Sequence, residues 1–427
     1  MNTLMKEKAN IPTLRFFEFD EAWNMNKFGH YYDFISTNSY SRNDLSYENG
    51  VVYNIHYGDI HTKFKSSFKL EDEYVPKILP QIDISRITEE RFVQEGDVLI
   101  ADASEDYSDI GKSIEAIDLN MKTVLSGLHT IQARQKTDET LTGFAAHSMQ
   151  SPNIRKQMMY IAQGTKVLGV SATRVGKLIY PLPTLPEQEK IAGFLGAVDE
   201  KIGELSRKKE LLIQYKTSSM QKLFSQEIRF KDGEGNNFPD WEEKKLSSFL
   251  CEHKLKSAGD EAVFSVSVHK GLVNQIEHLG RSFSAKNTNH YNRVQYGDVV
   301  YTKSPTGDFP LGIIKQSTIK EDVIVSPLYG VFTPETPYLG YWLHTYFLSS
   351  INTGNYLKPI IQKGAKNTIN ITNKTFLSNK LKVPIVLEEQ KLIADFLLVI
   401  DEKIDHTTEQ LALAKAFKKG LLQQMFV

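Results

Sequence analysis

The chain of 427 residues lacks several features, and each absence removes a class of protein. Its one cysteine, Cys251, allows no internal disulfide and no cysteine-rich zinc site. No run of 18 apolar residues is long enough to cross a membrane, and no apolar stretch of a secretory signal follows the first lysines. Neither sign of charge is in excess, with 51 lysines and arginines against 52 aspartates and glutamates. We therefore expect a cytoplasmic protein whose bulk charge does not indicate its partners.

Signatures of common enzymes are also missing. Residues 111–113, Gly-Lys-Ser, end like a phosphate-binding loop, but Asp106 stands where that loop needs glycine. Residues 239–244 contain the acidic residues and lysine of a metal-dependent nuclease, yet they lie too close together to converge on one metal. The chain has no Pro-Pro pair for an amino-methyltransferase motif, and its histidines lack metal-ligand spacing. We expect no catalytic residues and no metal site.

An internal repeat is the main positive signal. The segment EQEKIAGFLGAVDEKI (187–202) recurs as EQKLIADFLLVIDEKI (389–404), without a gap and with ten identities. Shorter upstream segments recur at nearly the same separation: 19–28 with 238–246, 93–101 with 294–302, 124–131 with 324–331, and 163–166 with 364–366. A period of about 200 residues indicates a duplicated domain and not a solenoid of short repeats.

Each copy ends in a long amphipathic helix, because its apolar residues recur in steps of three and four. These positions are Ile191, Leu195, Val198, Ile202 and Leu205 in the first copy and Ile393, Leu397, Ile400, Ile404 and Leu411 in the second. Such a stripe more often belongs to a domain core. Because two stripes occur in equivalent places, we expect the two helices to pack against each other as an antiparallel pair.

The rest of each copy is typical of mixed α/β structure. Runs rich in Val, Ile and Tyr predict strands at 51–60, 97–101, 263–268 and 298–302. The Gly-Asp pairs at 96–97 and 297–298 predict tight turns with a structural role. We expect two tandem globular α/β domains separated by two long, antiparallel, coiled-coil-like helices with pseudo-twofold symmetry. The predicted boundaries are 1–185 (first domain), 186–226 (central helix), 227–384 (second domain) and 385–427 (C-terminal helix).

These duplicated motifs resemble the specificity subunit of type I restriction-modification systems. The resemblance rests on the Glu-Gln-x-x-Ile-Ala-x-Phe-Leu segment, the following Asp-Glu-Lys-Ile, the Gly-Asp strand motif, the Phe-x-x-Trp opening and the Gly-x-Lys segment before each helix. It covers essentially the whole chain. One departure is Glu388, which stands where the first copy has Pro186.

The resemblance implies a function for each part. The two domains would be target recognition domains, each reading one half of a split, asymmetric sequence in double-stranded DNA. The helices would set the gap between the halves and dock two adenine-methyltransferase subunits that use S-adenosylmethionine. Nuclease-translocase subunits that use ATP and Mg²⁺ would join for restriction. No cofactor is expected in this chain itself.

Candidate DNA contacts are loop residues that can hold phosphates or read base edges. In the first domain we select His61, Lys63, Lys65, Arg134, Lys136, Lys166 and Arg174. In the second domain we select Lys270, Lys303, Ser304, Thr306, Lys363, Lys366 and Asn367.

Two other functions stay open on the sequence alone. A protein scaffold could use the helices to hold two partner-binding domains without touching DNA. A free-standing endonuclease is disfavoured because the catalytic motifs are missing.

Overall fold

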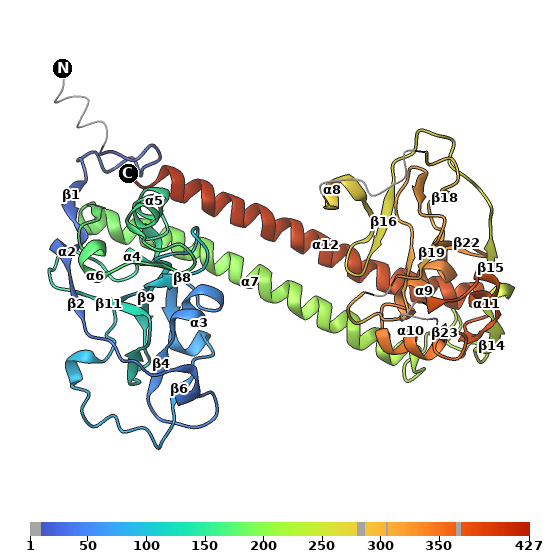
Figure 1. The fold of residues 1–427 in the computed structure, drawn as a ribbon, viewed down its shortest axis with the longest axis horizontal. Helices are drawn as coiled ribbons and strands as arrows, with labels where there is room; N and C mark the ends of the chain where they lie inside the picture. Colours follow the sequence, from blue (N-terminus) through green and yellow to red (C-terminus); the bar gives the residue numbers. More distant parts are fainter. Residues whose placement is uncertain (1–9, 280–286, 305, 364–368) are drawn as a thin grey trace. The chain divides into compact units, whose positions relative to one another are not determined.

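The structure is a computed structural model that describes residues 10–279, 287–304, 306–363 and 369–427. Its contacts divide the chain into two compact units (Figure 1). Unit 1 contains residues up to 207 together with 408–427, and unit 2 contains residues 208–407. Each unit therefore combines one globular domain with a segment of each long helix.

Unit 1 is built around a five-stranded sheet in the order β2-β11-β7-β9-β5. Its neighbours are antiparallel except β9 and β5, which are parallel. A four-stranded sheet has the order β10-β4-β6-β3, and β1–β13 and β8–β12 form two-stranded sheets. The strands are β1 (Asn24–Lys27), β2 (Tyr32–Ile35), β3 (Leu45–Ser46), β4 (Tyr53–Ile55), β5 (Ser67–Lys69), β6 (Lys77–Ile78), β7 (Val98–Ala101), β8 (Ala103–Ser104), β9 (Ser113–Asp118), β10 (Val124–Ser126), β11 (Thr130–Gln135), β12 (Leu168–Gly169) and β13 (Ile179–Leu182).

Short helices cover the sheets of unit 1. The α-helices are α2 (Phe28–Tyr31), α3 (Tyr57–Thr62), α4 (Ala145–Ser148), α5 (Pro152–Ile161), α6 (Ala172–Val175) and the long α7 (Leu185–Phe224), which continues into unit 2. Three 3-10 helices are η1 (Arg42–Asp44), η2 (Leu70–Asp72) and η3 (Glu89–Arg91).

Unit 2 is built around a four-stranded antiparallel sheet in the order β15-β22-β19-β20. Two-stranded sheets pair β14 with β25, β16 with β17, β18 with β21 and β23 with β24. The strands are β14 (Glu242–Lys245), β15 (Leu250–Glu252), β16 (Phe264–Ser267), β17 (Gly271–Asn274), β18 (Asn292–Val294), β19 (Val299–Thr302), β20 (Ile313–Gln316), β21 (Val323–Val325), β22 (Gly330–Pro334), β23 (Gln362–Lys363), β24 (Ile369–Asn370) and β25 (Lys380–Val383). The helices are η4 (Leu246–Ser248), α8 (Gln275–Leu279), α9 (Pro337–Tyr346), α10 (Ser350–Leu357), α11 (Asn373–Ser378) and the long α12 (Leu387–Gln424), which ends in unit 1.

The central strand of each unit lies between two apolar cores. In β7, Val98 and Ile100 face one cluster, while Leu99 and Ala101 face the other. This alternation follows from the two-residue period of a strand. In β19, Val299 and Tyr301 face one core and Val300 faces a second. A strand that is buried on both faces has a continuous run of apolar residues, which is why the sequence predicted both of these strands.

The Gly-Asp motif closes a turn just before each central strand. Gly96 and Gly297 have φ angles of 89° and 87°, which glycine adopts without steric cost. The Asp97 carboxylate accepts a hydrogen bond from the Gln94 amide at 2.9 Å. Asp298 accepts one from the Gln295 amide at 2.7 Å. The predicted structural role of both pairs is confirmed.

The start of each long helix is bound to its own domain through the repeated Glu-Gln pair. The buried Glu187 carboxylate receives two hydrogen bonds from Arg15, and the equivalent Glu389 receives two from Arg229. The Gln188 and Gln390 amides donate to the carbonyls of Pro183 and Pro384, at 2.8 and 2.9 Å. The repeated pair thus ties the first turn of each long helix to the segment that precedes it and to its own domain.

The predicted helix stripes are buried largely in the domain cores. Ile191 and Leu195 lie in the main core of unit 1, where Leu421 and Leu422 at the end of α12 also pack, together with Met425 and Phe426 just after it. Ile393, Leu397 and Ile400 lie in the main core of unit 2, together with Leu223 from the end of α7. Leu205 is buried in unit 1, and the remaining predicted positions, Val198, Ile202, Ile404 and Leu411, are half-buried. The packing is thus both helix on domain and helix on helix.

One predicted strand is wrong in part. We expected a strand over residues 51–60, but β4 ends at Ile55 and α3 begins at Tyr57. The His56 side chain caps this helix by accepting a hydrogen bond from the Gly58 amide at 3.1 Å. Asp59 then forms an i,i+4 ion pair with Lys63, at 3.0 Å. These local capping contacts outweigh the strand preference of the Val and Ile residues.

Candidate nucleic-acid interface

A polar and aromatic surface gathers in unit 1 at the end of the central strand β7. Helix α3 contributes Tyr57 and His61, and the turn between β10 and β11 contributes His129. Asp102 lies between β7 and β8. The His61 Nε2 atom lies 2.9 Å from the Ala103 carbonyl oxygen. The Tyr57 ring contacts His61 and His129 edge to face, with centroid distances of 6.2 and 5.3 Å. We call these four side chains the turn cluster. It offers several hydrogen-bonding groups side by side.

Basic residues border the turn cluster on one side. Lys63 donates to the Tyr47 hydroxyl at 2.7 Å, and its ammonium lies 5.0 Å from the centre of that ring. Tyr47 in turn stacks on Tyr74, whose side chain is 68% exposed. Lys112 donates to the carbonyl oxygen of His61 at 2.5 Å. Lys63 also forms the ion pair with Asp59, while the exposed Tyr74 ring leaves an aromatic surface near this lysine.

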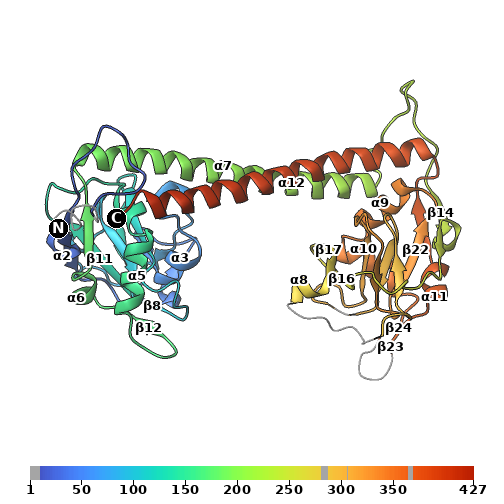
Figure 2. The same ribbon diagram turned by 90° about the horizontal axis from the view of Figure 1, so that it is seen from above.

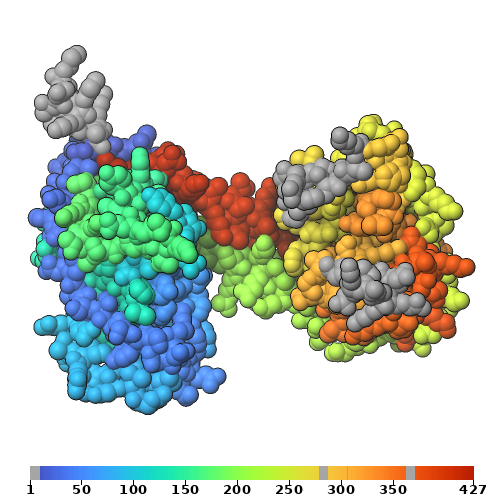
Figure 3. All heavy atoms as spheres, in the orientation of Figure 1, coloured from blue at the N-terminus to red at the C-terminus, as the bar shows by residue number. Residues whose placement is uncertain are grey.

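A loop precedes strand β12 in unit 1. It consists of residues 164–167, and its base is fixed by two hydrogen bonds between Gln163 and Gly169, at 2.9 and 2.7 Å. Strand β12 at its end pairs with β8, which follows Asp102. The loop stands out from the body of unit 1 (Figure 2), and the segment from α5 to β12, drawn in green, forms part of the visible surface (Figure 3). Lys166 is exposed there, beside Val167 and Tyr160, which are 56% and 88% exposed.

Several other predicted contacts in unit 1 have internal partners. Arg134 binds both oxygens of Asp97, at 3.0 and 2.7 Å, and also donates to the carbonyls of Glu90 and Phe92. Its side chain is 17% exposed, so its guanidinium is used to hold the turn before β7. Lys136 pairs with Asp33 at 3.0 Å.

Lys65 and Arg174 complete the set predicted for the first domain. Lys65 lies 3.7 Å from Asp72, and both side chains are more than half exposed. Arg174 donates to the Ile161 carbonyl at 3.0 Å and so supports the end of α5. Of the predicted residues, His61 is part of the turn cluster, Lys63 follows the same helix and pairs with Asp59, and Lys166 is exposed on the loop before β12. Arg134, Lys136 and Arg174 serve contacts within the domain.

In unit 2, the residues that follow β19 correspond to those that follow β7. Lys303 is half-buried, and burial lowers the pKa of its ammonium below the ordinary value, while the nearby Glu252 opposes that shift. Ser304 and Thr306 are exposed, and Thr306 is bridged to Phe309. Across the β21–β22 turn, Leu328 is 73% exposed. Two exposed hydroxyls and a lysine therefore follow β19, at the position that the turn cluster has after β7.

The other predicted positions of unit 2 lie apart or cannot be described. Lys270 is exposed at the turn between β16 and β17. Lys363 is the last residue of β23. Lys366 and Asn367 lie outside the described residues, so their predicted contacts are not tested by the structure.

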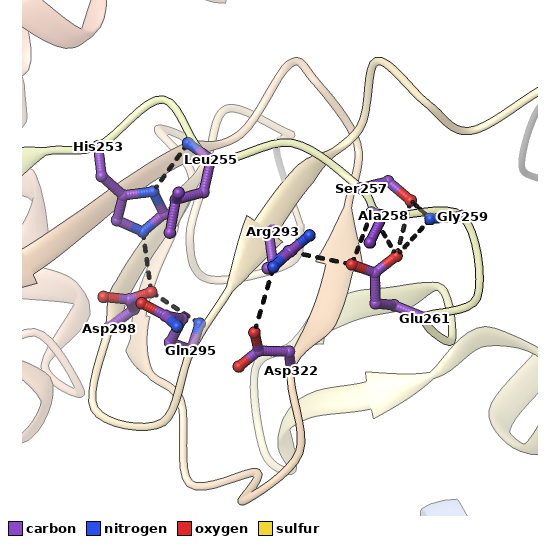
Figure 4. A network of polar contacts seen from close by, with 10 residues as sticks. All are labelled: His253, Leu255, Ser257, Ala258, Gly259, Glu261, Arg293, Gln295, Asp298 and Asp322. Atoms are coloured by element: carbon purple, nitrogen blue, oxygen red, sulfur yellow. Dashed lines mark hydrogen bonds and ion pairs between the residues drawn. The ribbon is translucent and has the colours of Figure 1, made fainter.

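A polar network fixes the segments next to β18 and β19 in unit 2 (Figure 4). His253 contacts Asp298 through Nε2 at 2.9 Å, taking the place that Arg134 has beside Asp97 in unit 1. Arg293 lies between Glu261, at 3.0 Å, and Asp322, at 3.7 Å. The Glu261 carboxylate accepts hydrogen bonds from the amides of residues 258 and 259, and the pKa of Glu261 is lowered to about 2 although burial opposes the shift. This network serves the fold, because its charges are mutually satisfied.

Within the described parts of the chain, no group of three or more His, Cys, Asp or Glu side chains is arranged to hold a metal ion. No described helix has the length and apolar character needed to span a bilayer.

Sequence reasoning missed most of the turn cluster. Tyr57, Asp102 and His129 come from three separate segments, and no spacing between them indicates that they meet. One usable signal was the repeat itself, because residues 124–131 recur as 324–331 and thus mark the β10–β11 turn as a shared feature. Tyr329 takes the place of His129 in the second copy.

Comparisons with known proteins give a consistent result. The sequence model of a family described as the type I restriction modification DNA specificity domain matches residues 255–415. Two relatives come from Methanocaldococcus jannaschii. The type I restriction enzyme MjaVIII specificity subunit is 26% identical over 376 residues, which are 82% of this chain and 83% of that protein. The putative type I restriction enzyme MjaX specificity subunit is 26% identical over 344 residues, or 76% of each chain.

Solved structures share the fold over nearly the whole chain. The S subunit of a type I restriction-modification system from M. genitalium aligns with a TM-score of 0.59 and 14% identity, covering 98% of this chain and 99% of that one. A chain from a study of complex assembly and conformational transition in the type I R-M system aligns with a TM-score of 0.51 and 15% identity, covering 95% and 98%. At these identities the likeness concerns the fold. It agrees with the mixed α/β architecture with long helices that the repeat predicted.

Proposed function

This chain belongs to the family of type I restriction-modification specificity subunits, and from that premise we propose that it gives such a complex its DNA sequence specificity. Each globular domain reads one half of a bipartite, asymmetric target in double-stranded DNA. The paired helices set the number of unread base pairs between the halves. The alternative of a scaffold without DNA contact is not favoured by the comparisons.

The observation that carries the proposal is the equivalence of the two domains at the end of their central strands. Both have a Gly-Asp turn, a strand buried on both faces, and then polar residues beside the turn that leads into its neighbouring strand, namely Asp102 and His129 in unit 1 and Lys303 and Ser304 in unit 2. The polar residues themselves differ between the two. A shared scaffold with different side chains suits two readers of two different short sequences.

The local charge supports DNA contact despite the balanced composition. Lys112 donates to the carbonyl oxygen of His61 in the turn cluster, Lys166 is exposed on the loop before β12, and Asp102 is bound to His129. Acidic residues gather elsewhere, as in the cleft of about 530 Å³ in unit 2 that residues 260, 261, 321 and 322 line. The field at a phosphate depends on the nearby charges more than on the sum over the chain.

We further propose that the chain itself is not catalytic and holds no cofactor. Methylation would come from two methyltransferase subunits with S-adenosylmethionine, and cleavage from nuclease-translocase subunits with ATP and Mg²⁺. The chain would act in the cytoplasm, where the DNA of the cell is accessible. Exposed apolar residues on the long helices, such as Leu211, Leu413 and Phe417, are available to partner subunits.

A binding titration tests the proposal. The target is first identified as the sequence that the complex methylates in cells. The purified chain, alone and with its methyltransferase subunits, is then titrated with a fluorescent duplex that contains this sequence and with a scrambled duplex of equal length. We expect the assembled complex to bind the target at least a thousandfold more tightly, as specific DNA-binding proteins do. Equal affinity for the two duplexes would contradict the proposal.

A further inference from the structure

His129 has a backbone conformation that its side chain does not favour. It lies in the turn between β10 and β11 with φ of 56°, in the left-handed region. Residues other than glycine are uncommon there, and such strain gathers at functional positions. Burial of the imidazole does not offset this backbone strain, because half of the side chain is exposed. The turn thus holds a strained residue whose ring is presented to solvent.

The orientation of the His129 ring is fixed by its neighbours. Its Nδ1 atom lies 3.1 Å from Oδ1 of Asp102, the residue that follows β7. The ring also packs edge to face on Tyr57, at 5.3 Å between centroids. A carboxylate that accepts from Nδ1 fixes the proton of the neutral ring on that atom and leaves Nε2 as a hydrogen-bond acceptor. The described residues provide no hydrogen-bond partner for Nε2.

We infer that His129 is a specificity-determining residue of the first domain, where its Nε2 accepts a hydrogen bond from the exocyclic amino group of a base in the major groove. Adenine and cytosine present such a group there, whereas guanine and thymine present acceptors. Asp102 is the positioning residue that selects the tautomer. This inference rests on the proposed function, because it names the base class that the domain reads at one position.

The second domain supports a reading role over a role in closing the turn. The equivalent residue is Tyr329, and its backbone is not left-handed. The equivalent of Asp102 is Lys303. Both partners of the His129–Asp102 pair therefore change together between the two copies, while the Gly-Asp turn and the strand pairing stay the same. A pair that varies on a constant scaffold is suited to discrimination.

Substitution of His129 by glycine separates reading from folding. Glycine relieves the left-handed strain and removes the imidazole, so the His129→Gly chain should have a thermal midpoint equal to or above that of the parent. Met121 provides a matched control, because it has φ of 54° and is fully exposed in another turn of the same unit. Met121→Gly relieves similar strain without removing a polar group.

The test measures the methylated sequence of DNA from cells that carry each full-length variant with the methyltransferase subunits. For His129→Gly we expect discrimination at one position of one half-site to fall about tenfold or more, with the other half-site and the gap unchanged. Asp102→Asn should relax the same position, and Met121→Gly should keep the parent sequence.

Three results would overturn the inference. The first is an unchanged target for His129→Gly. The second is a lower thermal midpoint with general loss of methylation, which would give His129 a structural role. The third is relaxation at that position by Met121→Gly as well. If the parent complex itself shows no defined methylated sequence, the proposed function fails together with the inference, and this outcome is distinguishable from the other three.

Discussion

The ammonium of Lys216 on α7 binds both carboxylate oxygens of Asp401 on α12, at 2.5 and 2.7 Å. Unit 1 repeats this relationship with the copies exchanged, because Lys418 on α12 binds Asp199 on α7 at 2.7 Å. Lys216 corresponds to Lys418 in the repeat, and Asp199 to Asp401. Each unit therefore joins the two repeated helices through the same pair of residue types, once in each direction. The same contact thus recurs within each unit, as the duplication of the sequence predicts.

The Lys216–Asp401 pair predicts a measurable loss of stability. In Lys216→Ala, Asp401 keeps only the hydrogen bond from the Tyr341 hydroxyl, at 2.5 Å, among its side-chain contacts in the described part of the chain. Because a charged hydrogen-bonding group loses its partner, we expect the free energy of unfolding of unit 2 to fall by about 1.5 to 3 kcal/mol. Urea denaturation of the whole chain measures this. Lys201→Ala, which removes an exposed i,i+3 pair with Glu204, should change the value by less than about 0.5 kcal/mol.

The helix stripe predicts graded effects of truncation. Leu195 and Leu397 are fully buried in the two main cores, so each Leu→Ala change should cost about 2 to 5 kcal/mol. Ile202 is half-buried, and Ile202→Ala should cost clearly less. Leu211, which is 53% exposed, serves as the control with little expected loss. Equal stability of Leu195→Ala and the parent in urea denaturation would show that this side chain is not in a core.

Buried histidines predict loss of stability in acid. Burial lowers the pKa of His147 to about 4, helped by the nearby Lys418. The unfolded chain titrates near pH 6.5, so between pH 6.5 and 4 it binds a proton that the folded chain does not. The stability from His147 is therefore complete above pH 6.5 and is lost as pH falls toward 4, by up to roughly 3 kcal/mol. His56 behaves in the same way, with its pKa lowered to about 4 by burial and by Arg42.

Comparison of variants isolates this effect. Glu115 acts in the opposite direction, since burial raises its pKa to about 8 and its contribution declines as pH rises toward that value. The contribution of Glu115 is the same in His147→Gln and in the parent, so it cancels when their unfolding free energies are compared. We expect the slope of unfolding free energy against pH, between 4 and 6.5, to be smaller in His147→Gln than in the parent. His269→Gln, at an exposed histidine, should keep the parent slope, and an unchanged slope in His147→Gln would contradict the assignment.

The long helices were predictable because their signal is local. Steps of three and four residues around Leu195 and Leu397 indicate a helix whatever it packs against, and the repeat marks both copies. The surface that each helix packs against was harder to predict, because Ile191 and Leu195 share a core with aromatic residues from the start of the chain, such as Trp23 and Phe28. Periodicity describes one face of a helix and not the surface that covers it.

The candidate interface was harder to predict because it depends on distant contacts. Arg134 looked like a loop cation, but folding brings Asp97 beside it from 37 residues away. His129 gave no signal in the sequence, since its φ angle and its contact with Asp102 arise from the closure of the β10–β11 turn. Lys63 and Lys166 are exposed, as expected of loop cations, and their contact with DNA stays a prediction.

The division of both helices between the units predicts how the gap responds to length. Each unit holds one segment of α7 and one of α12, so lengthening one helix alone would break the contacts of one unit. Seven residues inserted in both helices, after Lys209 and after Thr408, add about 10 Å of rise. Since DNA advances about 3.4 Å per base pair, the gap should lengthen by up to roughly three base pairs with both half-sites kept. The methylated sequence reports the gap, and an unchanged gap would contradict the helical spacer.

The most direct test of two independent readers is an exchange of one domain. Residues 238–382 are replaced by the corresponding segment of a relative with a different target, and methylated DNA from cells carrying this chain and the methyltransferase subunits is sequenced. The exchanged segment contains β14 and all of β25 except Val383, so most of this strand pair moves together. The account predicts that one half-site changes to that of the relative while the other half-site and the gap stay as in the parent. A change in both half-sites at once, or in neither, would contradict it.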